Sequence, residues 1–386
     1  MSEPPSAADD IRWMQAALNL GRRGFGVSSP NPAVGALVVR DGVVVGAGAT
    51  APGGRPHAER IALDEAGDAA RGATLYVTLE PCAHVGRGPA CADGAIAAGV
   101  KRVVSAMEDP DPRTAGDGHR RLREAGIEVV SGVAEAEARR AHRGHALRVR
   151  DGRPMLTLKL AMTADGYAAG AEHDARLAIT GEAANLRVQV LRSEHDAIMI
   201  GVGTARIDDP LLTVRLPGVA TKPLRVVLDS TLSLSTRSRI AASAREFPTL
   251  VLTTAAANAS RAEVLKSLGV EIEAIAATAD ARVDLRGGLQ ALARRGLARI
   301  FSEGGPTIGA RLVGEGLADE VLLFTAQKPL GRPGLPALDA ASRAALGDPR
   351  RYREIARSRY GADGLATYER VEGGDLKRDK GCSRAS

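Results

Sequence analysis

The sequence predicts an α/β protein with two domains. Apolar runs of strand length alternate with segments whose apolar residues recur at helical spacing. This pattern ends at Asp151-Gly152-Arg153-Pro154 and starts again directly afterwards. The 386 residues are also more than one domain usually holds. Alternation of this kind predicts sheets with helices packed against them.

The first half begins with a predicted helix over residues 11–20, which Asp9 or Asp10 could cap. Two short apolar runs follow at 33–39 and 43–47, and the Asp41-Gly42 dipeptide between them predicts a hairpin. Helices and strands are then expected in alternation at 57–66, 73–78, 91–98, 102–106, 118–125 and 127–131. A charged helical stretch over 134–148 leads to the boundary.

The second half opens with the apolar run 155–162, which ends in Asp165-Gly166. Strands are expected at 197–200, 224–228, 249–253, 270–274, 298–301 and 320–325. Helices are expected at 182–191, 261–268, 285–295 and 306–314. We therefore predict one domain over 1–150, a second over 151–372, and a disordered polar tail over 373–386.

Composition limits the possible functions. The chain is 44% hydrophobic but only 3% aromatic, so its cores must be aliphatic. Its net charge is +6 and its isoelectric point is about 9.5, yet arginine is scattered and not interleaved with aromatic residues that could stack on bases. We therefore expect a solvated basic surface, a few arginines that bind an anionic small molecule, and no nucleic-acid partner. No apolar run of about 18 residues exists, so no membrane partner is expected.

The most informative motif is His57-Ala58-Glu59, followed by Pro81-Cys82 and Cys91. Two thiolates and one imidazole leave the fourth position of a tetrahedral zinc ion open to water, and such a water ionises near neutral pH. Glu59 could take the proton of this water and pass it to a departing group. The motif is typical of zinc-dependent base deaminases, although eight residues separate the two cysteines here.

The motif has other interpretations. Cys82 and Cys91 could be small buried apolar residues, and His57 could be a helix-start residue with a satisfied ring. A disulfide between Cys82 and Cys91 is a further alternative, but the polar, acidic start of the chain gives no signal peptide, so we expect a reducing compartment. We favour zinc because two of the three cysteines gather around the one Pro-Cys; the third, Cys382, lies in the polar tail.

Two glycine-rich segments could bind phosphate. Gly46–Ala51 resembles a dinucleotide-binding loop, but Pro52-Gly53-Gly54 follows where a helix would be needed. The segment Glu303-Gly304-Gly305-Pro306-Thr307 is the better candidate, because its glycines let backbone N–H groups approach an anion at a helix start. An ordinary strand-to-helix turn is an equally good interpretation of its spacing.

Taken in order, these motifs resemble the bifunctional riboflavin-biosynthesis family, which joins a pyrimidine deaminase to a reductase. The resemblance rests on Ser29–Gly35, His57–Glu59, Pro81–His84, Lys159–Ala161, His195–Gly201, Asp208–Pro210 and Glu303–Gly305, within residues 9 to 370. It implies a cytidine-deaminase-like three-layer domain followed by a dihydrofolate-reductase-like domain. The implied substrate is 2,5-diamino-6-(5-phosphoribosylamino)pyrimidin-4-one, whose amine is hydrolysed before NADPH reduces the ribosyl group to a ribityl chain.

The resemblance also implies roles for individual residues. It makes His57, Cys82 and Cys91 the ligands of one Zn²⁺ ion and Glu59 the proton shuttle, and the long interval between the cysteines is normal for the family. Cofactor contacts are implied at Ala161, Thr204, Asp208, Ser230, Gly305, Pro306, Thr307, Ile308, Gly309, Ala310 and Arg311. Substrate contacts are implied at Asn31, Arg176, Arg192, Asp208, Leu211, Leu212, Arg215 and Glu303. Arginine at 192 and 215 suits a sugar phosphate, because guanidinium groups bind phosphate oxygens in pairs.

The chain departs from the family pattern at Gly88 and Ala90, where we expect altered loop stiffness, and at Arg176 and Ala178, where packing around the nicotinamide or substrate could change. The role of His84 is left open. The family implies a cytoplasmic enzyme and a homo-oligomer, a dimer formed through the reductase half. A nucleic-acid base deaminase with an accessory nucleotide-binding domain is the alternative, and a zinc-stabilised scaffold without activity is another.

Overall fold

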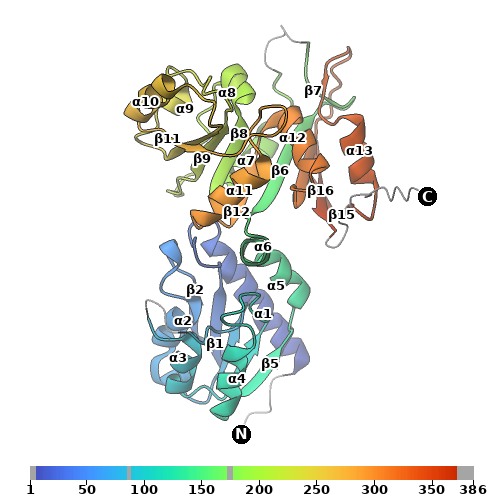
Figure 1. Ribbon diagram of the computed structural model, residues 1–386. Coiled ribbons are helices and arrows are strands. Elements are labelled where there is room, and N and C mark those ends of the chain that lie inside the picture. Colours follow the sequence, from blue (N-terminus) through green and yellow to red (C-terminus); the bar gives the residue numbers. More distant parts are fainter. Residues whose placement is uncertain (1–5, 85–87, 172–176, 372–386) are drawn as a thin grey trace, which may run out of the picture. The chain divides into compact units, whose positions relative to one another are not determined.

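The computed structural model describes residues 6–84, 88–171 and 177–371 (Figure 1). The predicted tail over 373–386 and the predicted contact Arg176 lie outside these ranges. The chain divides into two compact units: residues up to Met155 with Gln189–Ile198 and Leu211–Ile300, and Leu156–Val188 with Met199–Pro210 and the residues from Phe301 onward. This division does not follow the boundary placed at residue 151, which stays a prediction. No helix in the described ranges is long and apolar enough to cross a membrane.

The first sheet has five strands in the order β2-β1-β3-β4-β5. The strands are β1 (Gly35–Arg40), β2 (Val43–Ala49), β3 (Thr74–Val77), β4 (Arg102–Ser105) and β5 (Glu128–Ser131). β1 is antiparallel to β2 and β3, whereas β3, β4 and β5 are mutually parallel. The predicted hairpin is confirmed, since Asp41 and Gly42 have φ values of 50° and 74°, as a tight primed turn requires.

The helices of this half are α1 (Ala7–Gly21), α2 (Ala58–Ala66), α3 (Cys91–Ala98), α4 (Asp117–Glu124), α5 (Glu135–Ala141) and α6 (Arg143–Asp151). Short 3₁₀ turns occur at Arg22–Gly24, Pro52–Gly54 and Gly67–Ala70. The cap predicted for the first helix was wrong, because Ser6 caps α1 and its Oγ accepts a hydrogen bond from Asp9 N at 3.2 Å. Asp10 instead forms a buried ion pair with Arg102.

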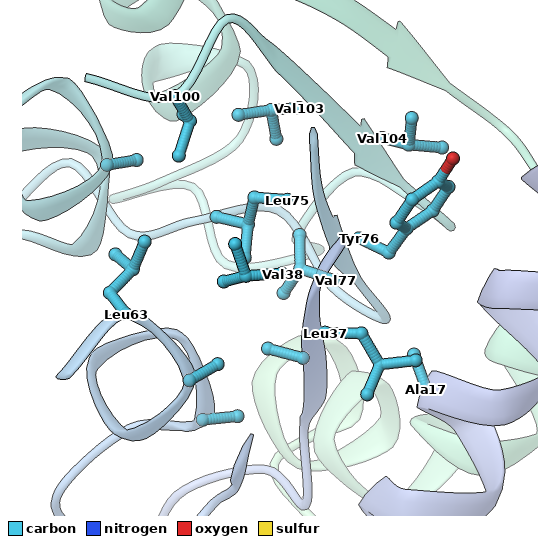
Figure 2. Packing of buried hydrophobic residues seen from close by; sticks show 14 of the residues in the cluster. Ala17, Leu37, Val38, Leu63, Leu75, Tyr76, Val77, Val100, Val103 and Val104 are labelled. Atoms are coloured by element: carbon cyan, nitrogen blue, oxygen red, sulfur yellow. The ribbon is translucent and has the colours of Figure 1, made fainter. Parts of the chain in front are cut away.

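The core of the first half is aliphatic, as its composition predicts. Figure 2 shows Leu37, Val38, Leu75 and Val77 from the sheet, which belong to one cluster of fully or nearly fully buried residues. Ala17 of α1 and Leu63 of α2 belong to the same cluster. Burying side chains of this kind stabilises a fold by roughly 1.5–3 kcal/mol each. The core thereby fixes α2, the helix that starts beside His57.

Two glycines bring α2 directly against β2. A Cβ atom on Gly46 would lie 2.1 Å from the carbonyl oxygen of Ala62, and one on Gly48 would lie 2.2 Å from that of Ala58. No larger residue fits at either position without a shift of the backbone. The glycines of the segment Gly46–Ala51 therefore serve strand-to-helix packing, which gives a physical reason why this segment is not a dinucleotide loop.

The second sheet has nine strands in the order β11-β10-β9-β8-β12-β6-β13-β16-β15. Its strands are β6 (Met155–Met162), β8 (Ala197–Gly201), β9 (Leu224–Leu228), β10 (Thr249–Thr253), β11 (Glu271–Ala274), β12 (Arg299–Ser302), β13 (Glu320–Thr325), β15 (Tyr352–Tyr360) and β16 (Asp363–Arg370). β7 (Tyr167–Ala169) and β14 (Leu335–Pro336) form a separate small sheet. The six strands that the sequence predicts in this half occur as β8 to β13, and the apolar run 155–162 forms β6.

The helices of this half are α7 (Glu182–Ser193), α8 (Val202–Asp208), α9 (Arg239–Ala242), α10 (Ala259–Ser267), α11 (Leu285–Arg294), α12 (Gly305–Gly314) and α13 (Ala340–Gly347). The sequence did not predict α8, α9 and α13, or the strands β7, β14, β15 and β16. Each of the three helices has eight residues or fewer, too short for a clear helical period.

Candidate functional site

Two helix starts and one irregular segment bring the zinc motif together. His57 is the residue before α2, and Cys91 is the first residue of α3. Cys82 lies in the irregular segment that follows β3. Its carbonyl oxygen accepts a hydrogen bond from Ala92 N at 3.2 Å, which ties this segment to the start of α3.

The three predicted ligands lie at distances that suit one metal ion. Nδ1 of His57 lies 3.2 Å from Sγ of Cys91 and 3.8 Å from Sγ of Cys82. One atom from each of the three side chains lies within 4.8 Å of the others. Zinc binds sulfur and nitrogen at about 2.0–2.3 Å, so two donors on one ion lie no more than about 4.6 Å apart. Both cysteines are free thiols, so the disulfide alternative is not supported.

The electrostatics of the group favour a thiolate at Cys82. Hydrogen bonds from Cys91 and His57 lower the pKa of Cys82 to about 4. One of these donors is the backbone N–H of Cys91, which lies 3.4 Å from Sγ of Cys82. The hydrogen bond to Cys82, together with burial, raises the pKa of Cys91. The N–H at the start of α3 therefore stabilises negative charge on Cys82.

Glu59 is buried at the same place, with 4% of its surface exposed. It is the second residue of α2, two positions after His57. Burial raises the pKa of its carboxyl group, while the charge of His57 acts in the opposite direction. A carboxyl group whose pKa moves toward neutral can both accept and return a proton, which is the property that a proton shuttle needs.

Two further polar residues lie close to these ligands in sequence or space. Nδ2 of Asn31 donates a hydrogen bond to the carbonyl oxygen of Gly54 at 2.8 Å and lies 3.3 Å from Nε2 of His57. Nδ1 of His84 lies 3.3 Å from Oγ1 of Thr114. Asn31 thus lies beside the zinc motif, whereas His84 is not among the grouped metal donors.

In the second half, one set of predicted residues gathers around the start of α12. Oγ1 of Thr204 donates to the carbonyl oxygen of Gly304 at 3.4 Å. Gly305 has a φ of 71°, and a Cβ atom there would lie 3.6 Å from Oγ1 of Thr204. A Cβ atom on Gly309 would lie 3.2 Å from Leu160, which places α12 close against β6.

The other predicted residues of this set lie on or next to β6, α8, β12 and α12. Ala161 is on β6, opposite Phe324 of β13. Asp208 ends α8, and Glu303 follows β12. Pro306, Thr307, Ile308, Ala310 and Arg311 belong to α12, with Pro306 in its first turn.

A second set surrounds the segment from Leu211 to Arg215. Nη1 of the buried Arg192 donates to the carbonyl oxygen of Thr213 at 3.1 Å. The backbone N–H of Arg215 donates to Oε1 of Gln189 at 2.9 Å. Leu212 is buried and has a φ of 50°, a conformation uncommon for leucine. One N–H of Arg192 therefore holds this segment in place.

Ser230 and Ala178 complete the predicted positions. Oγ of Ser230 accepts a hydrogen bond from Val283 N at 3.1 Å, just beyond β9. Ala178 is exposed, in an irregular segment before α7.

Sequence reasoning missed Glu80, a carboxylate beside the Pro-Cys pair. Its side chain is buried and accepts three backbone N–H groups. The apolar run before Glu80 indicates that its side chain is buried and needs hydrogen-bond partners, but it does not identify those partners.

Each half of the chain matches a known protein family. Residues 7–107 match the cytidine and deoxycytidylate deaminase zinc-binding region, and residues 154–343 match the RibD C-terminal domain. The chain is 39% identical to the riboflavin biosynthesis protein RibD of Aquifex aeolicus, over 83% of this chain and 88% of that protein. It is 37% identical to the RibD protein of Escherichia coli, over 90% and 96%.

Two solved structures have the same fold over nearly the whole chain. Acinetobacter baumannii RibD matches with a TM-score of 0.83 at 34% identity, covering 95% of this chain and 100% of that one. The diaminohydroxyphosphoribosylaminopyrimidine deaminase/5-amino-6-(5-phosphoribosylamino)uracil reductase of Thermotoga maritima matches with a TM-score of 0.80 at 30% identity, covering 95% and 99%.

Proposed function

Because the chain belongs to the RibD family of bifunctional riboflavin-biosynthesis deaminase/reductases, we propose that its two activities act in turn on one phosphorylated pyrimidine. The deaminase half is zinc-dependent and the reductase half uses NADPH. The proposed substrate is 2,5-diamino-6-(5-phosphoribosylamino)pyrimidin-4-one. The name of the Thermotoga maritima relative, which describes both reactions, supports this choice.

The observation that carries the deaminase proposal is the buried Glu59 beside His57, Cys82 and Cys91. Zinc, when bound by the three ligands, would lower the pKa of a water molecule and so supply the nucleophile. Glu59 would accept a proton from this water as the water oxygen bonds to the amidine-like ring carbon. Glu59 would then return the proton to the ring amino group, whose C–N bond breaks to release ammonia. Asn31 would orient the pyrimidine through its amide.

The reductase proposal assigns positions to the sugar. The ribose ring would open so that its first carbon forms an imine with the attached nitrogen. NADPH, when bound, would supply a hydride to this carbon, and the imine nitrogen would take a proton from water. The start of α12 and Thr204 would hold the cofactor. Arg192 and Arg215 would bind the phosphate, and Asp208 and Glu303 would accept hydrogen bonds from ribose hydroxyls. Leu211 and Leu212 would line the same sugar.

The test of the deaminase proposal is Glu59→Gln in the full-length chain. This variant should lose ammonia release, retain zinc and still oxidise NADPH when given the deaminated pyrimidine. Asp64→Asn is the matched control, because Asp64 is exposed on the same helix and pairs with Arg60. Ammonia release by Glu59→Gln near the wild-type rate would contradict the shuttle role.

The alternative of a nucleic-acid base deaminase is not supported, because the second half matches a reductase domain instead of an accessory module. We also propose that the protein is cytoplasmic and forms a homodimer through its reductase half. The family resemblance supports both points. Sedimentation of the full-length chain tests the dimer.

A further inference from the structure

Glu80 is a buried carboxylate two residues before the zinc ligand Cys82. Only 3% of its surface is exposed. Its Oε2 accepts hydrogen bonds from Asp109 N at 3.2 Å and Gly116 N at 3.0 Å, and its Oε1 accepts one from His119 N at 3.1 Å. A carboxylate in an interior needs such partners, and hydrogen bonds to a charged acceptor are stronger than neutral ones.

These bonds fasten the start of α4 to the segment that carries Cys82. The residue before α4 is Gly116, which has no side chain that could cap the helix. Glu80 caps the helix instead, because it accepts hydrogen bonds from N–H groups at the helix start, where negative charge is favourable. A Cβ atom on Gly118 would lie 1.9 Å from the carbonyl oxygen of Pro81. The first turn of α4 therefore rests directly on the backbone beside Cys82.

One side chain of α4 also contacts both zinc-bearing segments. Nη1 of Arg121 donates to the carbonyl oxygen of Ala83 at 3.0 Å. Nε of the same guanidinium lies 2.7 Å from Oδ1 of Asp93, which is on α3 two residues after Cys91. The segment that holds Cys82 is neither helix nor strand, so these contacts from α4 hold it where sheet hydrogen bonds cannot.

A second metal site is the competing interpretation, since Glu80, Glu108 and His119 offer ligand atoms within 4.8 Å of one another. Both oxygens of Glu80 are occupied by backbone N–H groups. Nε2 of His119 lies 2.8 Å from Oγ of Ser105. Hydrogen bonding within the protein accounts for this group, so we assign it no metal.

We propose that Glu80, through the start of α4, is a positioning residue that holds Cys82 in place for zinc. α4 lies beyond the part of the chain that matches the deaminase zinc-binding region, which ends at residue 107. The proposal rests on Cys82 being a zinc ligand. Removing a residue that holds a metal ligand in place commonly lowers metal affinity or activity about 10- to 100-fold.

The test measures transfer of zinc from the full-length, zinc-loaded chain to a coloured chelator. Glu80→Gln keeps the size of the side chain but places an NH₂ group against backbone donors, so zinc transfer should be about 10- to 100-fold faster. Deamination should fall, whereas NADPH oxidation with the deaminated pyrimidine should keep its rate. Tyr76→Phe is the matched control for stability alone, because it removes a buried hydrogen bond that Tyr76 of β3 donates to Asp10 of α1.

Zinc transfer from Glu80→Gln at the wild-type rate, or no faster than from Tyr76→Phe, overturns the proposal. The proposal is also overturned if the wild-type protein holds two zinc ions per chain and Glu80→Gln holds one, because Glu80 would then be a metal ligand itself. If Glu80→Gln does not fold, Arg121→Met decides, since Arg121 is partly exposed and its loss should still quicken zinc transfer. Transfer from Arg121→Met at the wild-type rate then overturns the proposal. Wild-type protein without zinc would instead refute the proposed function.

Discussion

Nδ1 of His57 lies 3.2 Å from Sγ of Cys91, although 34 positions separate them in the sequence. The contact exists because α2 and α3 both begin at the same place, where His57 precedes one helix and Cys91 opens the other. The zinc site therefore depends on where two helices start, and changes that move a helix should disturb the metal.

Gly48→Ala should destabilise the protein and weaken zinc binding. The added methyl group would lie 2.2 Å from the carbonyl oxygen of Ala58, so the first turn of α2 must shift, and His57 with it. Overpacking of this kind costs roughly 1–3 kcal/mol of unfolding free energy. Urea unfolding and zinc titration measure the two effects. Gly94→Ala on α3 is the control, because its nearest neighbour lies 3.9 Å away; equal effects of both variants would argue against the prediction.

The three metal ligands could be predicted from the sequence because His57-Ala58-Glu59, Pro81-Cys82 and Cys91 form a recognisable motif. His57 and Cys91 lie at helix starts, whereas Cys82 lies in an irregular segment. The part played by Glu80 could not, because its partners at 109, 116 and 119 follow it by 29, 36 and 39 positions and act through backbone N–H groups. No side-chain pattern reveals such a contact. Likewise, β15 was missed because most of Tyr352–Tyr360 is exposed, so no buried face marks it as a strand.

Acidification should destabilise the protein through His142. Burial lowers the pKa of this histidine to about 4 from 6.5, and its Nε2 lies 3.1 Å from Oγ1 of Thr78. Between these two pH values the unfolded chain binds a proton that the folded chain does not, so stability falls as pH falls, by up to roughly 3 kcal/mol. Unfolding free energies at several pH values should show a smaller decline in His142→Gln than in wild type. Identical slopes would contradict the prediction.

Arg225→Met should impair the reductase step. Arg225 is fully buried, and burial lowers its pKa to about 10. Its Nη1 donates to the carbonyl oxygen of Leu211 at 3.0 Å, and Nη2 donates to those of Ile240 and Phe247. Since Leu211 is one of the proposed sugar contacts, the KM for the deaminated pyrimidine should rise. Stability should fall by about 1–3 kcal/mol for each carbonyl left unpaired. An unchanged KM would contradict the prediction that Arg225 holds Leu211 in position for the substrate.

Gly305→Ala should weaken NADPH binding and spare deamination. Gly305 has a φ of 71° at the start of α12, a conformation that costs other residues about 1–2 kcal/mol. The helix start should therefore distort beside Thr204. NADPH titration followed by fluorescence should show a higher Kd. Gly314→Ala in the same helix has no atom within 4 Å of its new methyl group and should bind NADPH normally.

The most direct test of the account is the zinc content of the full-length chain, purified without chelators and measured by elemental analysis. One zinc ion per chain is expected in wild type, with most of it lost in Cys91→Ser. Wild-type protein that contains no zinc, or Cys91→Ser that keeps a full zinc ion, would contradict the assignment of His57, Cys82 and Cys91 as its ligands.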